Sequence, residues 1–263
     1  MHLNSLKKYI PNNDPIIIIG MHRSGTSIMG GVLSRLGIDM GEELVGKWWS
    51  NPLGHFEDKK FFSLNKRILE AAGGAWDAPP VRDAIQAQKD NFTEEIKDVI
   101  RRKRSSLWGW KDPRTSLTIK LYLPYLTNPY FIVCQRDHQA IAKSLRRRDN
   151  MEIEEGIRLA KIYEERINDF FKANPKLRML YIAYEEMLAV PEKQLKRTID
   201  FLEIRVNQEQ YQEALKFVLP KEKIGQLSKK VRAKRRIELV KKAVTKPWKI
   251  ARFILRKIRS KIP

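Results

Sequence analysis

The chain has 263 residues, which is enough for one large α/β domain with an extension, and 42% of them are hydrophobic, which is enough for a sizeable core. It has no run of about 20 apolar residues and no hydrophobic signal-peptide segment near residue 1, so we expect no transmembrane helix and no secretion signal. Its single cysteine, Cys134 in the apolar run YFIVC, excludes an internal disulfide and predicts a buried thiol in a cytoplasmic protein.

The net charge of +21 is unevenly distributed along the chain. Residues 221–263 carry 17 of the 52 basic residues and 2 of the 31 acidic ones, whereas residues 1–220 are only mildly basic. The charge pattern therefore predicts two parts, a catalytic or binding domain over 1–220 and a separate basic, helical extension over 221–263.

Hydrophobic patterning predicts strands that alternate with helices. Strands are expected at 16–20, 106–110, 130–135 and 177–184. Helices are expected at 27–36, 58–72, 92–104, 115–126, 138–148, 152–173 and 191–203, and the Pro-containing stretch 74–90 is expected to be a loop. This alternation is typical of βαβ units and predicts a P-loop-like, three-layer α/β/α fold with a central, mainly parallel sheet of about five strands.

The first expected strand runs into the loop of the sequence IIIIGMHRSGTS at residues 16–27. Backbone N–H groups from Ser24 to Ser27 can point at one anion there, and the helix that follows adds the positive end of its dipole. Glycine at position 25 lets the backbone approach that anion closely. The spacing favours a phosphate-binding loop over an ordinary strand–turn–helix connection.

The charge in this loop is not where an ATP-binding loop would carry it. A Walker-type loop has Lys before its Ser/Thr, whereas Thr26 stands there and the cation is Arg23, three positions earlier. No expected strand ends in a plain Asp of the magnesium-holding kind, because Arg136 precedes Asp137. We therefore expect an anion site without metal, in which the protein supplies the cations.

Two segments together resemble the nucleotide-binding segments of the sulfotransferase family. GMHRSGTS resembles its 5′-phosphosulfate loop, in the branch with Arg instead of Lys, and FIVCQRDHQAIAKSL at 131–145 resembles its 3′-phosphate segment. The resemblance implies 3′-phosphoadenosine-5′-phosphosulfate (PAPS) as donor, 3′,5′-ADP as product and no metal. The residues that it assigns to the nucleotide are Arg23, Ser24, Gly25, Thr26, Ser27, Arg136 and Ser144.

Two further segments extend the resemblance over roughly residues 14–205. GWKDPRTSL at 109–117 resembles the Lys-Asp-Pro segment of tyrosylprotein sulfotransferases and the Lys-Asp-Pro-Arg segment of bacterial and carbohydrate-type relatives. YEEML at 184–188, with FLEI at 201–204, resembles the family's Tyr-Glu-Asp-Leu segment and the helix after it. We interpret this part mainly as scaffolding. Cytosolic sulfotransferases have a His in the segment matching Lys111-Asp112-Pro113, and this chain has none there. The roles of site residues in that branch therefore cannot be assigned to this chain.

Sulfuryl transfer is an in-line displacement at sulfur, so the site needs cations for the developing charge and a base for the acceptor hydroxyl. We expect Arg23 and Lys111 to supply the cations. NPLGHFEDKKF at 51–61 resembles a segment of Arg-type bacterial relatives and suggests Glu57 as the base, followed by His55 and then His22. The alternative for Glu57 is a carboxylate in the first turn of the next helix.

Aromatic and basic segments outside these motifs leave the acceptor and partners open. The pair Trp48-Trp49 can stack on a sugar or simply pack. Residues 245–263 form a basic amphipathic pattern, which suits an anionic membrane surface at the inner face of the membrane or docking on protein, and KKVRAKRR at 229–236 can reach a nucleotide phosphate or lipid.

The predicted function is sulfuryl transfer from PAPS to a hydroxyl of a carbohydrate, glycolipid or small metabolite. Two alternatives stay open, an atypical P-loop kinase and a basic protein that binds nucleic acid or membrane without catalysis. We expect no nucleic-acid partner, because most of the charge belongs to the tail and no nucleic-acid motif is present.

Overall fold

The structure, a computed structural model, describes residues 14–46, 51, 53–101 and 107–218. Trp48, Trp49 and the basic extension 221–263 lie outside these ranges, so the expectations about them stay predictions. Among the described residues, no helix combines the length and the hydropathy that a membrane crossing requires.

Four parallel strands form the central sheet in the order β2-β1-β3-β4. They are β1 (Ile16–Ile19), β2 (Gly109–Lys111), β3 (Tyr130–Gln135) and β4 (Arg178–Ala183). Ile17 pairs with Trp110 on one side and with Phe131 on the other. All four carboxyl ends therefore reach the same edge of the sheet, where open α/β folds bind their ligands.

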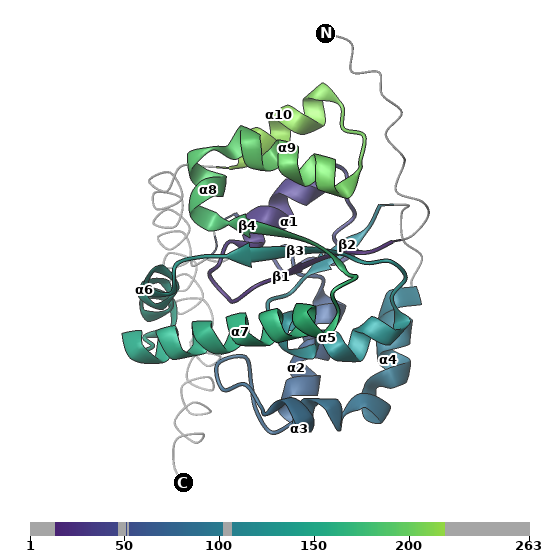
Figure 1. The fold of residues 1–263 in the computed structure, drawn as a ribbon, viewed down its shortest axis with the longest axis vertical. Coiled ribbons are helices and arrows are strands. Elements are labelled where there is room, and N and C mark those ends of the chain that lie inside the picture. Colours follow the sequence, from purple (N-terminus) through teal and green to yellow (C-terminus); the bar gives the residue numbers. More distant parts are fainter. Residues whose placement is uncertain (1–13, 47–50, 52, 102–106, 219–263) are drawn as a thin grey trace, which may run out of the picture.

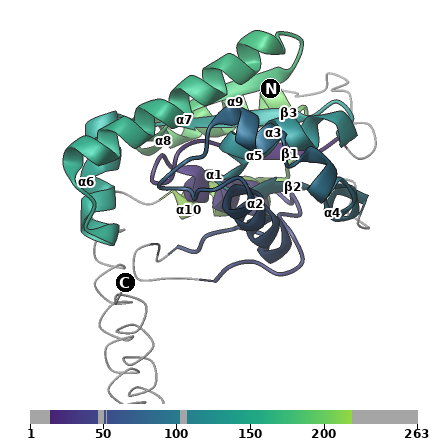
Figure 2. The same cartoon turned by 90° about the horizontal axis from the view of Figure 1, so that it is seen from below.

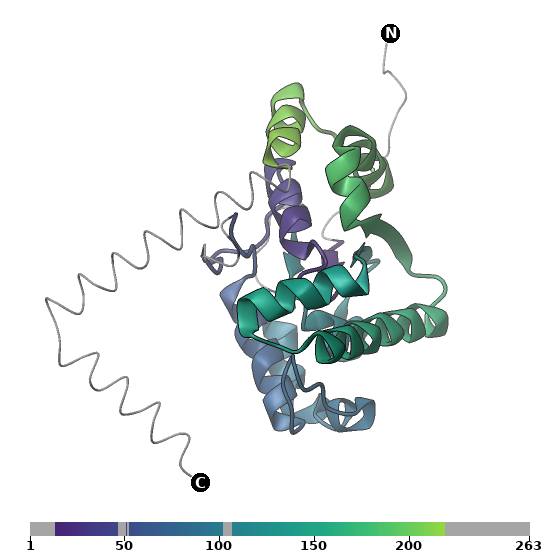
Figure 3. The same ribbon diagram turned by 90° about the vertical axis from the view of Figure 1, so that its left-hand side faces the viewer.

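Helices cover both faces of the sheet (Figures 1 and 2). One face carries α1 (Thr26–Arg35), α8 (Tyr184–Ala189), α9 (Pro191–Leu202) and α10 (Gln208–Phe217). The other carries α2 (Lys59–Ala71), α3 (Arg82–Gln86), α4 (Lys89–Arg101), α5 (Thr115–Tyr122) with a 3-10 turn at Leu123–Tyr125, and α7 (Ile153–Ala173). The remaining helix, α6 (His138–Asp149), lies at the carboxyl edge of the strands (Figure 3).

Alternating side chains of β1 divide the core into two clusters. Ile17 and Ile19 pack with the helices of the α2–α5 and α7 face, whereas Ile16 and Ile18 pack with α1, α9 and α10. All four isoleucines are fully buried. Burial of one such side chain contributes about 1.5–3 kcal/mol, so this strand fixes the register on which the site depends.

The predicted fold class is confirmed, with four strands among the described residues. The expectation that 74–90 is a loop is wrong in part, because α3 and the first residues of α4 fall within it. The helix α3 has only five residues and buries a single side chain, Ile85, so it has too few turns to show a helical period. The strand expected at 106–110 is observed at Gly109–Lys111. Trp108 lies before this strand and forms an isolated parallel bridge with Asp39.

Candidate active site

The loop after β1 combines three residues with positive φ. Gly20 has φ 145°, Arg23 72° and Gly25 104°. A Cβ at Gly25 would lie 2.9 Å from the ring of Tyr184, so only glycine fits between this loop and α8. Gly25 caps α1 without any side-chain hydrogen bond, which leaves the first N–H groups of the helix available to an anion.

Arg23 reaches across the carboxyl edge of the sheet to α6. Its Nε donates a hydrogen bond of 2.8 Å to Oγ of Ser144, and its carbonyl oxygen accepts one of 2.9 Å from Nη1 of Arg136. The loop and the segment after β3 are 121 residues apart at their contact, yet they are in direct hydrogen-bond contact. The two groups of residues that the sequence assigned to the two ends of one nucleotide therefore lie together.

Two buried polar atoms at this junction lack a hydrogen-bond partner among the described residues. They are Oγ of Ser24 and Nε of Arg136, and both residues line a small pocket at the carboxyl end of β3. Arg136 lies with its guanidinium 4.0 Å from the ring centre of Tyr184, and its closest carboxylate, on Glu185, is 3.7 Å away. Buried donors without a hydrogen bond are costly, so these atoms are suited to a bound oxyanion.

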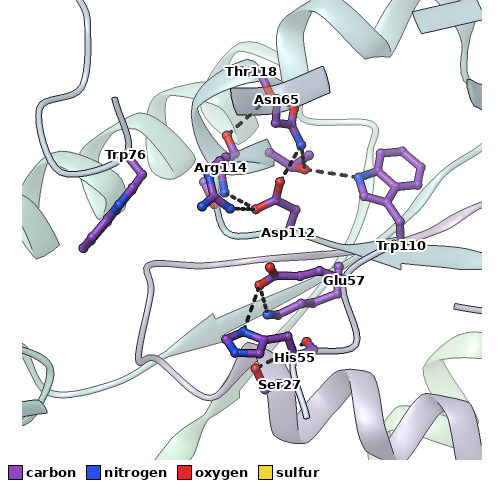
Figure 4. Close-up of polar contacts among 12 residues, drawn as sticks. Ser27, His55, Glu57, Asn65, Trp76, Trp110, Asp112, Arg114 and Thr118 are labelled. Carbon is purple, nitrogen blue, oxygen red and sulfur yellow. Dashed lines mark hydrogen bonds and ion pairs between the residues drawn. The ribbon is translucent and has the colours of Figure 1, made fainter. Parts of the chain in front are cut away.

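The carboxyl end of β2 contributes a buried ion pair. Nζ of Lys111 lies 2.6 Å from Oε1 of Glu57, and Nδ1 of His55 lies 3.9 Å from the same oxygen (Figure 4). Glu57 is fixed by its backbone, whose carbonyl accepts a hydrogen bond of 2.7 Å from the N–H of Val45. The structure thus brings three of the predicted catalytic residues, Lys111, Glu57 and His55, to one place.

The alternative interpretation of Glu57 as a helix-terminal carboxylate applies to its neighbour instead. Asp58 is the N-cap of α2, and its side chain accepts hydrogen bonds from the N–H groups of Lys60 and Phe61. The carboxylate of Glu57 does not cap the helix and instead accepts a hydrogen bond from Lys111.

Ser27 joins α1 to the segment that carries these residues. Its Oγ accepts a hydrogen bond of 2.8 Å from Nδ2 of Asn51 and contacts the carbonyl oxygen of His55 at 3.5 Å. Its hydroxyl is thus used to position the 51–57 segment, and its backbone N–H is the group that remains for the nucleotide.

Behind the ion pair, a buried polar network holds the Lys-Asp-Pro-Arg segment (Figure 4). Asp112 accepts hydrogen bonds from Nη1 of Arg114 at 2.9 Å and from Nδ2 of Asn65 at 2.9 Å. Oδ1 of Asn65 in turn accepts hydrogen bonds from the hydroxyls of Thr118 and Tyr122. This network links α2 to α5 and fixes the position of Lys111 directly before Asp112.

Two histidines near the loop are neutral at pH 7. Burial lowers the pKa of His22 well below its ordinary value, and it lowers the pKa of His55 to about 4. The cations Lys111, Arg23, Arg148 and Arg114 lower both pKa values further. His22 packs against the ring of Trp76 with ring centres 4.4 Å apart. Its Nε2 has no hydrogen-bond partner among the described residues.

Arg23 keeps its charge although it is poorly solvated. Burial, followed by the neighbouring charges of Arg148 and Arg136, lowers the pKa of its guanidinium to about 10. Within the described part of the chain, no carboxylate forms an ion pair with it. A cation held in this way favours an anionic ligand.

Sequence reasoning did not identify Arg148 or Trp76 as site residues. Arg148 follows Ser144 by four positions in α6, so a helical spacing rule would have placed both on one face. Its guanidinium lies 4.9 Å from the ring centre of Trp76. No comparable sequence signal marks Trp76, because its loop follows α2 without a motif.

Comparison with known proteins identifies the family. Residues 15–208 match the model of the sulfotransferase family. Solved structures similar to this chain include a sulfotransferase from Mycobacterium avium, at 17% identity and a TM-score of 0.45, covering 82% of this chain and 75% of that one. Another is the sulfotransferase domain of the Synechococcus PCC 7002 olefin synthase, at 17% identity and a TM-score of 0.47, covering 86% and 90%. No match was found among curated proteins.

Proposed function

The chain belongs to the sulfotransferase family, and from this premise we propose that it transfers the sulfuryl group of PAPS to an acceptor hydroxyl, without a metal ion. The acceptor is a carbohydrate, a glycolipid or a small metabolite. PAPS supplies the activated sulfuryl group, and the backbone and side chains of this chain supply the other requirements.

The observation that carries this proposal is the contact of Arg23 with Ser144 and Arg136. Both phosphate positions of PAPS are carried by one ribose, so the groups that bind them must face one cavity. Arg23 lies 2.8 Å from Ser144, and Arg136 lies 2.9 Å from the carbonyl of Arg23. Oγ of Ser24 and Nε of Arg136, which have no hydrogen bond among the described residues, provide two further donors for such a polyanion.

In this proposal, the backbone from Ser24 to Ser27 and the N-terminus of α1 hold the 5′-phosphosulfate. Arg136 and Ser144 hold the 3′-phosphate. Arg23 and Lys111 stabilise the charge that develops on the sulfonate and on the leaving phosphate, which is the task that a magnesium ion performs in kinases.

Glu57 is the proposed base, and His55 is the second candidate. Glu57 Oε1 lies 2.6 Å from Lys111, which couples the proton acceptor to one of the proposed cations. The low pKa of His55 leaves its imidazole neutral at pH 7 but makes it a weak base. In the transfer, the acceptor oxygen forms the new bond to sulfur, the base takes its proton, and the bond to the leaving phosphate breaks.

The proposal is tested with purified full-length protein, PAPS and a panel of hydroxyl acceptors. Release of 3′,5′-ADP that depends on acceptor and persists in EDTA is the expected result. Loss of activity in EDTA that magnesium restores would contradict the metal-free mechanism. Absence of both release and 3′,5′-ADP binding would contradict the function.

A further inference from the structure

A second small pocket lies between α3, α5 and α7, three neighbouring helices on one face of the sheet (Figures 1 and 2). None of the residues assigned above to the nucleotide or to the transfer lines it. Its polar lining consists of Arg82 and Gln86 from α3, Ser116 and Lys120 from α5, and Arg166 and Asp169 from α7. Three of these six side chains are cations, and the space between them suits a small ion but not a nucleotide.

Arg166 brings an uncompensated charge to this pocket. Its Nη2 donates a hydrogen bond of 2.5 Å to the carbonyl oxygen of Pro80, whereas its Nη1 is buried and has no hydrogen-bond partner among the described residues. Burial, followed by the positive charge of Arg82, lowers the pKa of the Arg166 guanidinium. A buried cationic donor without a partner is costly, so this nitrogen is suited to an anion.

The carboxylates around the pocket are already used by Arg82. Nη2 of Arg82 lies 3.1 Å from Oε1 of Glu165 and 2.5 Å from Oδ2 of Asp169. Neither Lys120 nor Arg166 forms an ion pair with a carboxylate of the described ranges. Two cations from different helices, α5 and α7, therefore line one pocket without a counter-charge.

Ser116 is shared by the pocket and by the loop that follows β1. Its Oγ accepts a hydrogen bond of 3.0 Å from the N–H of Gly20 and contacts the carbonyl oxygen of Gly20 at 3.3 Å. Because this hydroxyl is used by Gly20, the donors that remain for an ion are Arg166, Lys120 and the amide of Gln86. The pocket thus lies behind the loop, outside the proposed nucleotide site.

We propose that this pocket is a second anion site, which binds inorganic sulfate or phosphate through Nη1 of Arg166, with Lys120 and Gln86 as further donors. A guanidinium offers its N–H groups in a planar fork that matches the oxygens of such an ion. The bound ion would neutralise the uncompensated charge and join α3, α5 and α7. The inference does not depend on the proposed function, because no residue of the nucleotide site takes part.

Melting temperatures of the full-length protein test the inference. Sodium sulfate or sodium phosphate replaces sodium chloride at constant ionic strength, and saturating 3′,5′-ADP occupies the nucleotide site. We expect a stabilisation that saturates with anion concentration, as binding to one site requires. Exclusion of sulfate from the protein surface also stabilises, but this effect rises without saturation.

Two variants and one control identify the pocket. Arg166→Met should weaken the apparent affinity for sulfate about 10- to 100-fold, the range of hydrogen bonds to charged groups. Lys120→Met should weaken it by up to about 5-fold, the range of an exposed ion pair, and should leave the fold intact because Lys120 is exposed. The control Lys161→Met removes an exposed charge of α7 outside the pocket and should leave the affinity unchanged.

A sulfate effect that does not saturate, or that is equal in wild type, Arg166→Met and Lys120→Met, would overturn the inference. Loss of the effect on addition of 3′,5′-ADP would also overturn it, because the ion would then lie in the nucleotide site. Failure to bind 3′,5′-ADP is a different result: it contradicts the proposed function, and the same titrations without nucleotide still compare the variants.

Discussion

Nζ of Lys111 lies 2.6 Å from Oε1 of Glu57, and both side chains are almost completely buried. They come from positions 54 residues apart, the segment just before α2 and the end of β2. Loss of one partner of a buried ion pair leaves the other charge uncompensated, at a cost of about 3–5 kcal/mol. Stability and the proposed chemistry are therefore coupled at this pair.

Replacement of Glu57 by Gln should lower turnover by about 10²–10⁴-fold, because the variant cannot accept the proton of the acceptor hydroxyl. Its affinity for 3′,5′-ADP should stay close to wild type, since Glu57 contacts neither Arg136 nor Ser144. Steady-state kinetics and calorimetric titration measure the two quantities.

A second variant distinguishes the role of Glu57 as base from its contribution to stability. The double variant Glu57→Gln, Lys111→Met removes both charges and should recover much of the thermal stability that Glu57→Gln loses, but no turnover. Full turnover of a folded Glu57→Gln protein would show that Glu57 is not the base, and His55→Gln would then be the next variant to measure.

The backbone of Arg23 has a strained conformation that a glycine would adopt without strain. Its φ of 72° lies in the left-handed region, which costs a non-glycine residue about 1–2 kcal/mol, and burial lowers the pKa of its guanidinium to about 10. We expect Arg23→Gly to keep or raise the melting temperature of the free protein while it abolishes turnover. A variant that melts several degrees lower, or that keeps its activity, would contradict this role of Arg23.

Much of this site could be predicted from the sequence, because its anchors lie directly after strands. Glycine-rich spacing after Ile19 and an arginine after Gln135 carry local signals, and parallel strands bring their ends together. The position of Trp76 depends instead on hydrogen bonds from α7, which no local pattern encodes. The loop prediction for 74–90 was wrong in part for a similar reason, since α3 is held by the burial of Ile85.

Stability should fall as the pH falls below about 6.5, the ordinary pKa of histidine. Burial lowers the pKa of His22 and His55 in the folded state, the latter to about 4, so the unfolded chain binds more protons between these values. Each proton that only the unfolded chain binds lowers the free energy of unfolding by up to about 1.4 kcal/mol for each pH unit of acidification. Denaturant unfolding of wild type and His55→Gln from pH 7 to 4.5 measures how the free energy of unfolding depends on pH. The same pH dependence in both proteins would contradict the assignment to His55.

Asn65 should contribute strongly to stability, although it lies behind the site. It is fully buried and bonds Asp112, Thr115, Thr118 and Tyr122. Asn65→Leu removes one hydrogen bond from each of these groups, at about 0.5–1.5 kcal/mol each, although Asp112 keeps Arg114 and Thr115 keeps Trp110. The matched control is Asn91→Leu at an exposed position, which should change the free energy of unfolding by about 0.5 kcal/mol or less. Comparable losses in the two variants would rule out the network as a main source of stability.

Titration of the free protein with 3′,5′-ADP and with 5′-AMP tests the central claim most directly, since the two nucleotides differ only in the 3′-phosphate. The account predicts that 3′,5′-ADP binds about 10- to 100-fold more tightly and that Arg136→Ala removes the difference. Equal affinities for the two nucleotides, or no binding of 3′,5′-ADP at about 1 mM, would contradict it.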